Sequence, residues 1–137
     1  MVDINELKYY GQWYDSDNED FHMWWYSVYD EKVYRFDELM EHFSFERYED
    51  IIEADGYIPL WKTNFVRVAR EFLTGLKNEK VDKFLQEYPG DEFYGYFEWY
   101  TTSTDNHIIT WWYEYEDSAL TNDAIKWCRK HGIPYKK

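Results

Sequence analysis

Two helices are the plainest prediction from the spacing of hydrophobic positions. Apolar side chains recur at intervals of three and four over residues 65–76 and again over residues 81–88, which places each set on one helix face. Thr63 or Asn64 can cap the first helix and Asn78 the second, and a Pro-Gly pair ends the pattern. Because the loop between the helices is short, we expect an antiparallel helical pair.

A β-hairpin is predicted where "FHMWWYSVY" and "KVYRF" flank the turn "DE", because aromatic residues and Val favour strands. Alternation puts Met23 and Trp25 on one side of the first strand and Trp24, Tyr26 and Val28 on the other. Both sides are therefore apolar. That pattern is typical of a central strand whose two faces are covered.

A second hairpin is predicted over residues 93–115, "FYGYFEWYTTSTDNHIITWWYEY". Two runs rich in aromatic and β-branched residues surround "STDN", which has the composition of a turn. The tripeptide Trp-Trp-Tyr occurs once in each predicted hairpin, at 24–26 and 111–113. Beyond it only Asp30 and Asp117 match, which is too little similarity for an internal duplication. We therefore expect two strands of similar composition.

Helical spacing also begins at Asp37, which we expect to be the N-cap, and continues with a break near Ser44 as far as Gly56. The Pro-containing segment that follows is expected to be short and extended. A last apolar stripe over residues 120–131 predicts a C-terminal helix that Gly132 ends.

Together these elements predict an α+β fold, in which an antiparallel aromatic-rich sheet of two hairpins packs against about four helices, including the αα-hairpin. A chain of 137 residues fits a single domain over residues 1–137. With 45% hydrophobic residues and a mean hydropathy of -0.84, it should be globular and contain no membrane span.

Aromatic residues make up 23% of the chain, as 8 Trp, 15 Tyr and 9 Phe. A core built from rings with polar edges leaves some of them half exposed, where they suit contact with a protein or a ligand. Trp24, Tyr26, Trp111 and Tyr113 are therefore candidate binding residues.

The net charge of −13 changes the set of partners to expect. An acidic chain repels phosphate, so nucleic acid and anionic membranes are disfavoured, whereas a basic protein partner is compatible. The oligomeric state is left open. The acidic loop "YDSDNED" adds four candidate binding residues, namely Asp15, Asp17, Glu19 and Asp20. It lacks the Gly and the final Glu of a calcium-binding EF-hand loop, so it is interpreted as a solvated loop.

Few side chains suggest covalent or metal chemistry. The one cysteine, Cys128, excludes an internal disulfide and lies on the apolar stripe of the last helix, which favours a buried structural thiol. The four histidines lack metal-ligand spacing, and the sequence has no phosphate-binding glycine loop and no Gly-x-Ser-x-Gly elbow. We expect no cofactor, no metal and no catalytic residue. The absence of a signal-peptide pattern favours the cytoplasm.

The stretches "YIPL", "FVRVAREFLTGL", "EKVDKFL" and "WYEYEDSALTNDAIKWCRKHGIPY" follow one another through residues 57–135. In this order they resemble an uncharacterised bacterial family, number 0158 in the uncharacterised-protein-family series. Two features depart from it: the turn "DE" lacks the expected glycine, and "FYGYFEWYTT" has strand composition where the family pattern indicates a helix. The family has no assigned activity, so the resemblance implies no site residues.

Two functional hypotheses follow from the composition. The first is a non-catalytic acidic protein-binding module of the immunity, inhibitor or nucleic-acid-mimic type, which engages a basic partner. The alternative is a small-molecule-binding protein or enzyme with an aromatic-lined pocket between the sheet and the helical pair.

Overall fold

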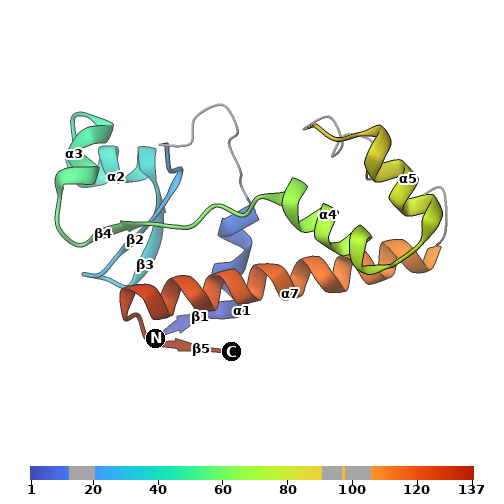
Figure 1. The fold of residues 1–137 in the computed structure, drawn as a ribbon. Coiled ribbons are helices and arrows are strands. Elements are labelled where there is room, and N and C mark those ends of the chain that lie inside the picture. The colour runs from blue at the N-terminus through green and yellow to red at the C-terminus, as the bar shows by residue number, and fades with distance from the viewer. Residues whose placement is uncertain (13–20, 91–96, 98–105) are drawn as a thin grey trace. The chain divides into compact units, whose positions relative to one another are not determined.

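The computed structural model describes residues 1–12, 21–90, 97 and 106–137 (Figure 1). They fall into two compact units, the first made of Met1–Lys62 with Asp123–Lys137 and the second of Thr63–Asn122. The architecture is α+β, as the sequence predicted, and the single domain over the whole chain stays a prediction.

The first unit is built on a three-stranded antiparallel sheet. Strand β2 (Trp24–Ser27) pairs with β3 (Lys32–Arg35) on one side and with β4 (Tyr57–Pro59) on the other. This arrangement confirms the first predicted hairpin and the central position of its first strand. The extended Pro-containing segment is the third strand.

One face of the sheet is covered by α2 (Phe36–His42) and α3 (Tyr48–Glu53). Trp25 points from β2 into this layer, where it is buried together with Leu39 and Ile51. The predicted break between the helices is confirmed, because Ser44 adopts a positive φ of 59° that a continuing α-helix excludes.

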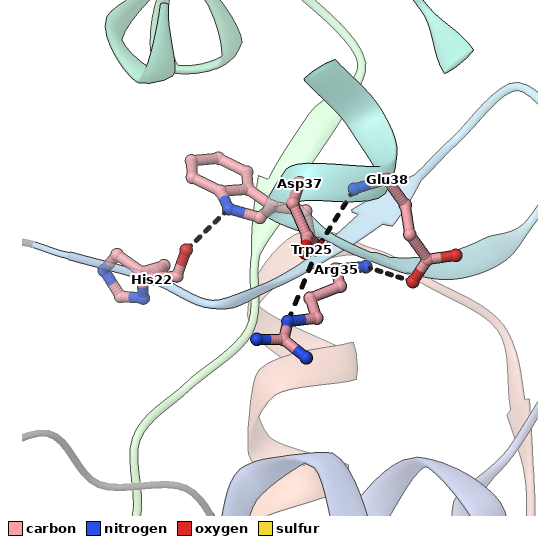
Figure 2. A network of polar contacts seen from close by, with 5 residues as sticks. All are labelled: His22, Trp25, Arg35, Asp37 and Glu38. Atoms are coloured by element: carbon pink, nitrogen blue, oxygen red, sulfur yellow. Dashed lines mark hydrogen bonds and ion pairs between the residues drawn. The ribbon is translucent and has the colours of Figure 1, made fainter. Parts of the chain in front are cut away.

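The start of α2 differs from the prediction, since the N-cap is Arg35 and Asp37 lies in the first helical turn. The reason is visible in Figure 2: the Glu38 carboxylate accepts a hydrogen bond from the Arg35 backbone N–H at 3.1 Å, which moves the helix start toward the N-terminus. Asp37 instead accepts from the Glu38 N–H at 3.0 Å and pairs with the Arg35 guanidinium at 3.5 Å.

The opposite face of the sheet carries Trp24 and Tyr26 and packs against α1 (Ile4–Leu7) and the last turns of the C-terminal helix α7 (Asn106–His131). The Trp127 indole N–H donates to the Pro59 carbonyl at 3.0 Å, which ties this helix to β4. The buried members of this layer are Ile4, Leu7, Tyr26, Leu60, Ala124, Ile125, Trp127, Cys128 and Ile133.

Two short elements complete the first unit. A 3-10 helix, η1 (Lys8–Gln12), follows α1 directly. Strand β1 (Val2–Asp3) pairs in parallel with β5 (Tyr135–Lys136), so residues near both termini lie side by side.

The second unit contains the predicted helical pair, α4 (Phe65–Gly75) and α5 (Glu79–Glu87). Both caps are confirmed, because the Asn64 side chain accepts from the Arg67 N–H at 3.1 Å and the Asn78 side chain from the Lys80 N–H at 2.9 Å. The hydrophobic core of this unit comprises Val68, Ala69, Phe72, Leu73, Val81, Phe84, Phe97, Ile108 and Trp112.

The second predicted hairpin is wrong wherever the structure describes it, because α7 (Asn106–His131) is a continuous helix that includes the second Trp-Trp-Tyr. Ile108 and Trp112 are four residues apart, share a helix face and are buried. Trp112 packs on Phe72 and Phe97 with centroid distances of 5.5 and 4.8 Å. This packing overrides the strand preference of its neighbours. Residues 93–105, apart from Phe97, lie outside the described residues.

The end of α7 agrees with the prediction. Gly132 has a φ of 65° and follows the last helical residue, and the Ile133 N–H donates back to the Cys128 carbonyl at 2.9 Å. Cys128 is fully buried, and burial raises the pKa of its thiol. The expectation of a buried thiol is therefore confirmed.

Substitution of two glycines tests the turn before β4. Gly56 has a φ of 94° and a Cβ there would lie 2.5 Å from the Tyr29 ring, so Gly56→Ala should lower the free energy of unfolding by about 1–2 kcal/mol. Gly75→Ala is the matched control, because Gly75 is helical and an added Cβ would have no neighbouring atom within 4 Å outside its own helix backbone among the described residues. Ala there should stabilise the protein by up to about 1 kcal/mol. Urea unfolding measures both, and an unchanged Gly56→Ala protein would contradict the left-handed turn.

Candidate functional site

Five aromatic rings form a connected patch beside the β2–β3 turn of the first unit. Tyr57 lies at its centre, with ring centroids 5.8 Å from Tyr29, 5.4 Å from Phe45 and 6.0 Å from Phe43. Phe43 also contacts Tyr34 at 5.5 Å. We call these five residues, Tyr29, Tyr34, Phe43, Phe45 and Tyr57, the aromatic surface.

Two members of the aromatic surface are open to solvent, since Tyr29 is 69% exposed and Phe43 41% exposed. Tyr34, Phe45 and Tyr57 are half-buried beneath them. The Tyr29 hydroxyl donates to the backbone carbonyl of Asp55 at 2.8 Å, which fixes the exposed ring across the turn. The patch thus combines exposed apolar area with a defined geometry.

A carboxylate is held at the edge of the patch by one of its own tyrosines, because the Tyr34 hydroxyl donates a hydrogen bond to Asp30. This bond, followed by burial, raises the pKa of Tyr34 to about 12. Burial alone would raise the pKa of Asp30, but hydrogen bonds from the Tyr34 and Ser27 side chains and from nearby backbone lower it overall. Asp30 is therefore charged at neutral pH.

Negative charge is concentrated in the segment that carries the aromatic surface. Residues 28–57 contain ten Asp and Glu against three Lys and Arg. Two of these cations already have carboxylate partners, because Arg35 lies 3.5 Å from Asp37 and Arg47 lies 3.4 Å from Asp50. The surroundings of the exposed rings are therefore acidic.

The layer beneath the patch is connected by hydrogen bonds. The buried Trp25 donates its indole N–H to the backbone carbonyl of His22 at 2.8 Å (Figure 2), and the His22 N–H donates to the Tyr48 hydroxyl at 2.7 Å. The His22 ring nitrogen Nδ1 lies 3.1 Å from the Leu60 carbonyl, an acceptor, so the neutral ring must carry its proton on Nδ1. His22 is thereby engaged in structural contacts.

The candidate residues chosen from the sequence are placed differently. Asp15, Asp17, Glu19 and Asp20 all lie outside the described residues, and they stay predictions. Trp24 and Tyr26 share one face of β2, opposite the aromatic surface. Trp24 is half-buried with its ring 4.8 Å from Tyr10, and Tyr26 is only 3% exposed.

Trp111 and Tyr113 are 51% and 61% exposed on the part of α7 that belongs to the second unit. On a strand they would share one face, but residues two apart on a helix point about 200° apart. They therefore form no joint surface. Glu114 and Glu116 are also two residues apart and point to different sides of the helix. Burial is the main cause that raises the pKa of Glu116, and the negative charge of the neighbouring Asp117 adds to it.

The sequence interpretation missed all five residues of the aromatic surface. One signal was present, since Tyr29 lies next to the predicted turn, and a turn between two strands exposes its side chains. Phe43 had no such signal, because it fits the apolar stripe of the preceding helix and its exposure follows only from the break after it.

Tyr34 and Asp30 provide a direct test of the geometry at the patch edge. In Asp30→Asn the pKa of Tyr34 should fall from about 12 toward the ordinary value of about 10. In the wild type, a raised folded-state pKa means that the stabilisation is complete below about pH 10 and disappears as pH rises through about 12. NMR titration of 13C-labelled tyrosine rings, assigned with Tyr34→Phe, measures the shift.

Asp55→Asn is the matched control for this titration, because only the backbone carbonyl of Asp55 contacts a ring of the patch. It should leave the Tyr34 titration unchanged. A wild-type Tyr34 that titrates together with the exposed tyrosines would contradict the hydrogen bond.

In comparisons with known proteins, no family model, no curated protein and no solved structure matches the chain. The resemblance to uncharacterised family 0158 stays a prediction. Within the described part of the chain, no helix is long and apolar enough to cross a membrane. Within the same part, no cluster of three His, Cys, Asp or Glu side chains could hold a metal ion.

Proposed function

We propose that the protein is a non-catalytic binding module that uses the aromatic surface to engage a basic protein partner in the cytoplasm. The observation that carries this proposal is the coincidence of exposed, contacting rings with a segment that contains ten Asp and Glu against three Lys and Arg. An inhibitor, an immunity protein and a nucleic-acid mimic all bind in this way, with carboxylates facing a cationic surface.

The exposed rings supply the binding energy in this proposal. Aromatic residues are enriched at the centres of protein interfaces, where they bury large areas at small cost in side-chain entropy. Tyr29 meets this requirement well, because its hydroxyl is already bonded to the Asp55 carbonyl and its ring is supported by Tyr57. Binding should therefore cost little further conformational entropy at this side chain.

The carboxylates supply orientation and speed of association. Negative charge around the rings attracts a basic surface over a Debye length of about 8–10 Å and repels acidic proteins and nucleic acid. Because these carboxylates are exposed, their contribution should weaken as salt is added. The small-molecule alternative stays a prediction, and nothing at the aromatic surface specifically favours it.

The experiment is capture of partners from the native cytosol at low salt, followed by identification and binding measurements with the purified proteins. The partner should be basic, and its affinity should fall about tenfold or more between 50 and 300 mM NaCl. The double variant Tyr29→Ser, Phe43→Ser should weaken binding by about thirtyfold or more, which corresponds to a loss of about 2 kcal/mol, the contribution of a single hot-spot residue.

Tyr9→Ser is the matched control, because Tyr9 is 55% exposed and belongs to the same unit but lies outside the aromatic surface. It should bind like the wild type. An acidic partner, or equal losses in Tyr9→Ser and in the double variant, would overturn the proposal.

A further inference from the structure

The turn that precedes β4 contains the one Asp-Gly pair of the chain, Asp55 and Gly56. In such a pair the backbone nitrogen of the glycine can attack the side-chain carboxyl carbon of the aspartate and close a five-membered succinimide ring. Glycine favours this attack, because it has no Cβ to shield its nitrogen and its backbone rotates easily. In a helix or sheet, hydrogen bonds hold the amide in place, so the reaction first requires local opening.

Both reacting groups are unengaged in this turn. Gly56 lies outside the helices and strands, and within the described residues its N–H donates no hydrogen bond. The Asp55 side chain is exposed, and in the same part of the chain its carboxylate has no hydrogen bond or ion pair. The nucleophile and the carboxyl group can therefore meet without unfolding of the unit.

The hydrogen bonds of the turn involve its backbone carbonyls instead. The Asp55 carbonyl accepts from the Tyr29 hydroxyl at 2.8 Å, and the Gly56 carbonyl accepts from the Val28 N–H at 2.9 Å. The Tyr29 ring lies 5.8 Å from Tyr57, the central ring of the aromatic surface. The Asp-Gly pair is thus part of the support of this surface.

We propose that Asp55 and Gly56 are a site of spontaneous succinimide and isoaspartate formation. The Gly56 nitrogen forms a bond to the Asp55 Cγ, and the amide proton leaves with the carboxyl OH group as water. A second water molecule then opens the ring. When it cleaves the bond between the nitrogen and the former backbone carbonyl carbon, the chain runs through Cβ and that carbonyl becomes a carboxylate. The only co-reactant is solvent water.

The isoaspartate form would change the support of the exposed Tyr29 ring. The oxygen atom that accepts the Tyr29 hydroxyl would belong to a charged carboxylate, and the turn would be longer by one backbone atom. The longer turn also alters the hydrogen bond between Gly56 and Val28, which joins the end of β2 to the turn. This inference goes beyond the proposed function, because the reaction requires no partner.

The test incubates the full chain, folded in buffer and unfolded in urea, for several weeks at physiological temperature. Trypsin then releases residues 48–62 as one peptide, since it cleaves after Arg47 and Lys62. Electron-transfer fragmentation distinguishes isoaspartate from aspartate and locates it, and the succinimide is lighter by one water. Isoaspartate at residue 55 should form in the folded chain within about tenfold of the rate in urea, because the turn needs no opening.

Two controls accompany this measurement. Asp50 lies in the same peptide but in α3, precedes the β-branched Ile51, and accepts from the Arg47 N–H at 3.1 Å, so it should stay unmodified in the folded chain. Asp55→Glu should abolish the modification at this position, because the ring would need six members and closes far more slowly. The Asp55 side chain is exposed, so this variant should keep the fold.

Isoaspartate at residue 55 in urea but not in the folded chain would overturn the proposal, as would equal modification of Asp50 and Asp55 in the folded chain. A second readout follows the 13C-labelled tyrosine rings by NMR, with Tyr29 assigned from Tyr29→Phe. A new Tyr29 signal should grow in proportion to the isoaspartate fraction. A Tyr29 signal that stays the same in extensively modified protein would contradict the effect on the aromatic surface. Both readouts are independent of any binding partner, so their failure is separate from failure of the proposed function.

Discussion

Burial of both faces of β2 is the constraint on which the first unit depends. Trp25 and Tyr26 are adjacent, point to opposite sides of the sheet and are 2% and 3% exposed. Burying large side chains of this kind contributes roughly 1.5–3 kcal/mol each. A strand with two such faces needs a layer of helices on each side. Helices α2 and α3 cover one face, and α1 and the end of α7 cover the other.

The extent of these layers decides which parts of the sheet stay open. On the Trp25 side, the helices are short and their junction at Ser44 leaves Phe43 at the rim, where it joins Tyr29 and Tyr57. On the Tyr26 side, α1 has only four residues and does not cover the whole face, so an open groove of about 440 Å³ lies beside it. Both surfaces are places where a small layer ends before the sheet does.

Local signals explain how much of the fold could be predicted from the sequence. The helical pair, its caps at Asn64 and Asn78 and the first hairpin were predictable, because each depends on spacing and capping within a few residues. The N-terminal half of α7 was not. Its buried Ile108 and Trp112 are interleaved with the exposed Trp111 and Tyr113, and apolar residues on several sides of a helix hide its period.

The candidate site was less predictable than the fold. Composition indicated that some rings must remain near the surface, yet which rings do so depends on where tertiary layers end. Trp24 and Tyr26 were selected as binding residues for an interface and lie in a core layer instead.

The first unit is made of two segments that are far apart in the sequence, and this has a consequence for its synthesis. Its Tyr26 face is closed by Ala124, Trp127, Cys128 and Ile133, which follow the 60 residues of the second unit, Thr63–Asn122, along the chain. At translation rates of about 5–20 residues per second, the ribosome needs roughly 3–12 seconds to add that segment. During this time β2 lacks the end of α7, which covers its Tyr26 face in the complete fold. The growing chain therefore exposes the apolar Tyr26 face of the sheet until the last turns of α7 have been synthesised.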